Sequence, residues 1–132
     1  MDGIERSELV IARILELAMD KGITNWTLEF KCLKLDDQFA EHFLPSVRWL
    51  EMEGIIRVES YVDALTGPKN SWAVSPTLTS HGFSELGRRV DLGNGSKPLA
   101  EAVKEVSGQN GNFTRAGNFT GGFLASFLKS VG

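Results

Sequence analysis

The spacing of the apolar residues changes at Gly54, and this change constrains the fold more than any other feature of the sequence. Before Gly54, Pro45 is well placed in the first turn of a helix that runs to about Glu53 and turns Leu50 inward. After it, residues 55–62 form a β-branched and aromatic run, which is typical of a strand. Glycine readily adopts the left-handed conformation that ends a helix. We therefore expect a helix to stop at Gly54 and a sheet to begin at once.

Three elements are predicted before this point. Residues 4–20 repeat apolar side chains at helical spacing, which predicts a long amphipathic helix. Residues 26–33 alternate apolar and polar side chains, which indicates a strand with one buried face, although a helix remains possible there. Asp36 or Asp37 can cap a short helix that reaches residue 43.

A hairpin and a closing helix are predicted after Gly54. Residues 71–75 alternate like a second strand, and the intervening residues include Gly67-Pro68, a strong turn signal. Thr79 or Ser80 can then cap a helix through about residue 89. We expect this helix to bury two apolar side chains, Phe83 and Leu86.

The series helix, strand, helix, helix, hairpin, helix resembles the winged-helix variant of the helix-turn-helix, in its bacterial or phage form. Residues 46–60, SVRWLEMEGIIRVES, look like the family's passage from the third helix into the first strand of the wing. Residues 78–89, LTSHGFSELGRR, look like its closing segment. The resemblance covers about residues 4–90. It implies an α+β fold, a winged helix-turn-helix with a three-helix core and a small antiparallel sheet.

The remaining sequence predicts a C-terminal extension of this domain. Residues 91–98, DLGNGSKP, are rich in Gly, Asn and Ser and indicate a linker, so the winged-helix domain is expected over residues 1–90. Residues 99–132 form the predicted extension. It contains a short helix over residues 99–106, an arm in which GNFT occurs twice, and an amphipathic terminal helix.

The resemblance implies that the third helix and the wing contact DNA. The residues at the matching positions are Ser46, Arg48, Trp49, Lys69 and Asn70. Charge argues against this function, because residues 45–70 carry three basic and four acidic side chains and the whole chain has a formal charge of −3. The leading prediction is nevertheless an oligomeric DNA-binding protein that regulates transcription. The alternative is a winged-helix protein-interaction module that does not bind DNA and docks or assembles through its apolar C-terminal tail.

The apolar side chains of the extension predict docking or oligomerisation. Two belong to the GNFT repeats and five recur at helical spacing near the end; they are Phe113, Phe119, Phe123, Leu124, Phe127, Leu128 and Val131. A helix of about twelve residues is not stable alone in water, so this stripe needs a partner surface. The surface can be the chain's own domain or a second copy in a homo-oligomer. A bilayer is less favoured, because Arg115 and Lys129 are the only cations near the stripe.

Other function classes find little support in the residues. Cys32 is the only cysteine and the two histidines, His42 and His81, lie far apart, so no metal site is expected. The sequence has no nucleophile elbow and no phosphate-binding loop, and we expect neither enzymatic activity nor a cofactor. The N-terminus is acidic where a signal peptide is basic and then apolar, so the sequence predicts a cytoplasmic protein.

Overall fold

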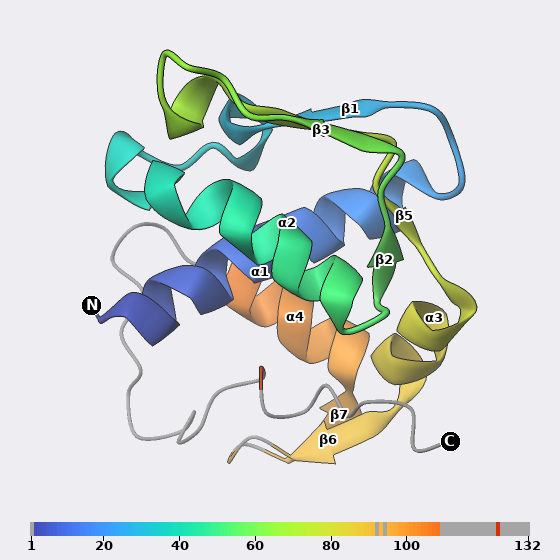
Figure 1. Cartoon of the computed structure of the whole chain (residues 1–132). Coiled ribbons are helices and arrows are strands. Elements are labelled where there is room, and N and C mark those ends of the chain that lie inside the picture. The colour runs from blue at the N-terminus through green and yellow to red at the C-terminus, as the bar shows by residue number, and fades with distance from the viewer. Residues whose placement is uncertain (1, 92, 94, 109–123, 125–132) are drawn as a thin grey trace.

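Helices and short antiparallel strands alternate along the chain in the computed structural model, which describes residues 2–91, 93, 95–108 and 124 (Figure 1). The α-helices are α1 (Gly3–Lys21), α2 (Phe43–Met52), α3 (Ser80–Gly87) and α4 (Leu99–Ser107). Three short 3-10 helices are η1 (Phe30–Leu33), η2 (Asp37–His42) and η3 (Pro68–Asn70). The strands are β1 (Thr27–Glu29), β2 (Ile56–Arg57), β3 (Ser60–Val62), β4 (Trp72–Val74), β5 (Thr77–Leu78), β6 (Arg89–Asp91) and β7 (Ser96–Pro98). The fold is therefore α+β, as predicted.

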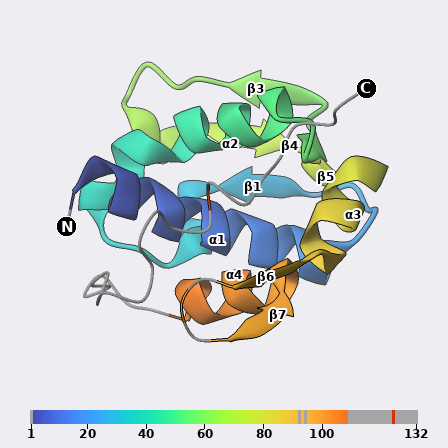
Figure 2. The same cartoon turned by 90° about the horizontal axis from the view of Figure 1, so that it is seen from below.

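Helix α1 lies between α2 and α4 (Figure 2). Its buried side chains include the consecutive residues Val10, Ile11 and Ala12, so it packs against neighbours on more than one side. Asp2 and Glu5 form a reciprocal capping box that fixes the first turn. The predicted helix over residues 4–20 is confirmed.

The main sheet has three antiparallel strands in the order β1-β4-β3. Leu28 of β1 and Tyr61 of β3 both pair with Ala73 of β4, which lies between them. Strands β3 and β4 form the predicted hairpin, with η3 in its connection. Strands β2 and β5 pair separately at the base of this hairpin. The element order and the pairing are compatible with a winged-helix-like fold.

The predicted strand over residues 26–33 is confirmed only for its first part. Strand β1 ends at Glu29, and the chain then turns into η1. Phe30 and Leu33, three residues apart, are both buried. A continuous strand would point these two side chains to opposite faces, whereas a tight helical turn directs both into the core.

The turn and cap signals read from the sequence are confirmed. Asp36 accepts a hydrogen bond from the Gln38 amide at the start of η2. Pro45 lies in the first turn of α2, and Gly54, with φ of +78°, follows the end of that helix. The side chain of Thr79 caps α3 by accepting a hydrogen bond from an amide of its first turn.

Two predictions about residues 78–98 are wrong. Residues 91–98 are not a linker, because β6 and β7 pair as a hairpin in which Gly93 and Gly95 have positive φ angles. A tight hairpin turn and a linker share the same Gly-rich composition, so composition alone did not distinguish them. Phe83 is 49% exposed rather than buried, because the buried side of α3 is formed instead by Gly82, Glu85 and Leu86.

The domain boundary predicted at residue 90 is also wrong, because α4 belongs to the main core. Its four buried apolar residues, Leu99, Ala102, Val103 and Val106, pack in the same cluster as α1. Arg13 of α1 connects α4 to η1 through two hydrogen bonds. Its Nε donates to the carbonyl of Ser107 at 2.5 Å, and its Nη1 donates to the carbonyl of Leu33 at 2.6 Å.

A substitution at Gly82 tests the close packing of α3 against the backbone of Ile55. A Cβ atom at this position would lie 2.2 Å from the carbonyl oxygen of Ile55, whereas at Gly87 of the same helix no atom lies within 4 Å. We expect Gly82→Ala to lower the free energy of unfolding by about 1–3 kcal/mol, because the backbone must move. Gly87→Ala, the matched control, should not lower it. Urea unfolding measures both, and equal stabilities would contradict the described contact.

Candidate functional site

The five residues predicted to contact DNA do not form one outward-facing surface. Ser46 is buried, and Trp49 is half-buried and packs against the core. Both line a groove between α1 and α2 instead of the outer side of α2. Ser46 is therefore inaccessible to a DNA base in this structure, and the prediction for this residue does not fit.

The charged side chains of α2 turn toward the β3–β4 hairpin. The Arg48 guanidinium lies 4.9 Å from the centre of the Tyr61 ring, and its Nη2 is 3.9 Å from Oδ2 of Asp63. Oε1 of Glu51 accepts a hydrogen bond from the Tyr61 hydroxyl at 2.8 Å, and Oε2 accepts one from the Val58 amide at 3.0 Å. These contacts join α2 to the sheet and satisfy both charges within the protein.

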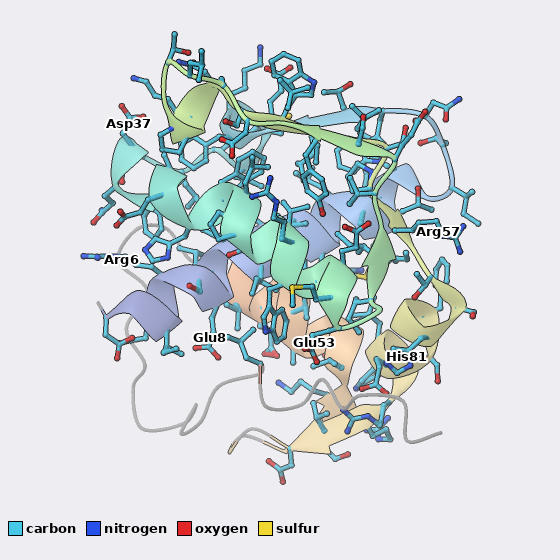
Figure 3. All side chains as sticks on the ribbon, in the orientation of Figure 1. Arg6, Glu8, Asp37, Glu53, Arg57 and His81 are labelled. Atoms are coloured by element: carbon cyan, nitrogen blue, oxygen red, sulfur yellow. The ribbon has the colours of Figure 1, made fainter. Side chains whose placement is uncertain are left out.

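The two predicted DNA contacts near the hairpin tip also have partners. Nζ of Lys69 lies 3.3 Å from Oδ2 of Asp37, and Nδ2 of Asn70 donates to Oγ1 of Thr66 at 3.1 Å. Figure 3 shows Asp37 beside the hairpin tip and Arg57 at the other end of the sheet. Lys69 and Arg48 thus each lie beside a carboxylate, of Asp37 and Asp63, and Arg57, the third cation of residues 45–70, lies away from the hairpin tip.

The exposed residues of α2 are Pro45, Arg48 and Met52, and Met52 is 81% exposed. Pro45 and Met52 are apolar. Neither side chain offers a hydrogen bond of the strength that reading a base edge requires. Arg48 remains the one basic residue of this helix.

The groove between α1 and α2 has a volume of about 250 Å³. It is lined by Ile4, Ser7, Ile11, His42, Pro45, Ser46, Trp49 and Leu124. Most of these side chains are apolar. A polar pair lies among them, because Oγ of Ser7 is 3.2 Å from Nδ1 of His42. The groove can therefore receive an apolar side chain and offer a hydrogen bond beside it.

Residues 4–20 carry a sequence signal for this groove besides the core-facing pattern of the helix. Ile4, Ser7 and Ile11 recur at steps of three and four, so they share one face of α1. That face meets the start of α2, where Pro45 and Trp49 are four residues apart. The partial exposure of this stripe was not deducible, because it depends on which elements cover α1.

Leu124 is the member of the predicted docking set that the structure describes. It is half-buried and packs against the hydrophobic core. The other predicted residues, Phe113, Phe119, Phe123, Phe127, Leu128 and Val131, lie outside the described residues. The same holds for the GNFT arm and the predicted terminal helix.

Within the described part of the chain, no group of three or more His, Cys, Asp or Glu side chains is arranged to hold a metal ion. None of its helices combines the length and the apolar character that a membrane crossing requires.

Comparison of the chain with protein-family models, with curated proteins and with solved structures yields no match.

Tyr61 provides a spectroscopic test of the contact between α2 and the hairpin, because it is the only tyrosine in the sequence. Burial raises the pKa of Tyr61 above its ordinary value, and the hydrogen bond to Glu51 raises it further, while Arg48 acts in the opposite direction. We expect tyrosinate absorption to appear at a pH well above 10 in the folded protein and near 10 in urea.

This raised pKa makes a contribution to stability that is present below the unfolded-state pKa and is lost as the pH rises through the folded-state pKa. Glu51→Gln keeps an acceptor but removes the charge, so it should lower the pKa of Tyr61 toward its ordinary value. An ordinary pKa in the folded wild-type protein would contradict the described contact.

Proposed function

We propose that this protein is a winged-helix-like protein-interaction module that binds an apolar segment of a partner in the groove between α1 and α2. The element order supports the winged-helix assignment, as does the sheet order β1-β4-β3, in which the strand after the first helix pairs with the hairpin. This fold serves both DNA and protein binding, so the function must be argued from the surface.

One observation carries the proposal. The helix that would contact DNA has Arg48 and Glu51 in contact with Tyr61 of the hairpin, and its two other exposed residues, Pro45 and Met52, are apolar. The same helix forms one wall of a mainly apolar groove, which Leu124 also lines. Arg48 and Glu51 have partners within the protein, whereas the groove offers apolar surface to a partner.

The groove also restricts the chemistry of the partner. Ile4, Ile11 and Trp49 favour an aliphatic anchor, because its burial contributes roughly 1.5–3 kcal/mol. One anchor of this kind gives only weak binding, so a partner needs further contacts along the helix surface. An amphipathic helix that presents leucine or phenylalanine every three or four residues meets this requirement.

DNA binding remains the second candidate, and a specific observation favours it. The ion pairs of Arg48 with Asp63 and of Lys69 with Asp37 are both largely exposed to solvent. Exposed pairs of this kind contribute only about 0–1 kcal/mol, so both cations could exchange their partners for phosphates at little cost.

Titration of labelled duplex DNA at low salt separates the two functions, because electrostatic binding is strongest there. We expect no saturable change in fluorescence anisotropy for the wild-type protein. Saturable binding that is lost in the double variant Arg48→Ala, Lys69→Ala would instead establish the DNA function. Lys34→Ala, Lys104→Ala is the matched control, since it removes two exposed positive charges outside α2 and the hairpin.

A further inference from the structure

We infer that Leu124 is a built-in ligand of the α1–α2 groove, which a partner must displace from the same chain before it can bind. This inference rests on the proposed function, since it assumes that the groove is the docking site. The inference names Leu124 as the residue that occupies the partner's position in the free protein. It therefore also states how access of a partner to the groove is controlled.

The position of Leu124 supports this assignment. Its side chain lines the groove together with residues from three elements, Ile4 of α1, His42 of η2 and Trp49 of α2. Leu124 is also half-buried and packed against the core cluster. An aliphatic side chain that is distant in sequence from α1 and α2 thus contributes to the lining of an apolar groove and packs against the core beside it.

The sequence around Leu124 is that of a docking segment. Phe123, Leu124, Phe127 and Leu128 recur at the spacing of an apolar helical stripe. Residues 108–123, which include five glycines, connect this segment to the end of α4. A connection of this length gives an effective concentration of roughly millimolar for an intramolecular ligand. Even a weak contact of Leu124 therefore competes with a partner present at micromolar concentration.

This competition has a measurable consequence for affinity. The apparent affinity of any partner is reduced by the fraction of molecules in which the groove is free. A chain whose groove is free in about one molecule in ten binds roughly tenfold more weakly than a chain whose groove is open. The kind of partner that fits is an amphipathic helix whose apolar anchor replaces Leu124 beside Ser7 and His42.

The test uses the full chain and a labelled synthetic peptide with the sequence of residues 121–132, GGFLASFLKSVG. Leu124→Ala in the full chain removes most of the internal competitor. We expect this variant to bind the peptide about tenfold or more tightly than the wild-type protein. Leu65→Ala is the matched control, because Leu65 is fully exposed and lies outside the groove. It should bind the peptide like the wild type.

A second pair of variants locates the binding site in the Leu124→Ala chain. Ile4 lines the groove and is 59% exposed, so Ile4→Glu places a charge there with little effect on the core. We expect it to abolish peptide binding. Ile23→Glu, at a position 79% exposed and outside the groove, should leave binding unchanged. Circular dichroism verifies that each variant is folded.

The outcomes separate the inference from the proposed function. One outcome is that the peptide binds the wild-type protein and Leu124→Ala with equal affinity, and that Ile4→Glu abolishes peptide binding in each of them. The groove is then a docking site, but Leu124 does not control access to it. If the peptide binds neither protein, the groove does not accept an apolar segment and both proposals fail. Light scattering completes the test, because a wild-type dimer that Leu124→Ala converts to monomers would place Leu124 in the groove of a second copy.

Discussion

The burial of helix α1 on several sides is the constraint on which the rest of the structure depends. Helices α2 and α4 pack on it, and so do η1, η2 and β5. Arg13 adds a polar connection, because one guanidinium binds the carbonyl groups that end both η1 and α4. Burial lowers the pKa of Arg13, and the nearby carboxylate of Glu16 acts in the opposite direction. The positions of α2, α4, η1 and η2 are therefore defined relative to α1.

This arrangement also determines which surfaces of α2 remain for binding. One side of α2 packs on α1, and Arg48 and Glu51 direct their charges to the hairpin through Tyr61. What remains is the rim shared by α1 and α2, where the residues are mainly apolar. An order of elements compatible with a winged helix thus coexists with a mainly apolar groove beside α2.

Local signals in the sequence predicted local structure well. Gly54, Pro45 and Thr79 each act within one turn of the chain, through a backbone conformation or a cap, so their roles could be read directly. Features that depend on contacts between segments far apart in the sequence could not be predicted from local patterns. The exposure of Phe83 depends on how α3 meets Ile55, and the groove depends on which elements leave the Ile4 side of α1 uncovered. Of the residues that line the groove, the sequence singled out Leu124 for docking and Ser46 and Trp49 as DNA contacts, and the groove itself was not predicted.

The position of α4 in the chain has a consequence for biosynthesis. Arg13 and Ser107 are 94 residues apart in sequence, yet one hydrogen bond joins them. Contacts of such sequence separation require closure of a long loop and slow the folding reaction. On the ribosome, the side of α1 that α4 covers stays open until residues 99–107 have been made. Until α4 emerges, this side of α1 is exposed to aggregation and to binding by chaperones.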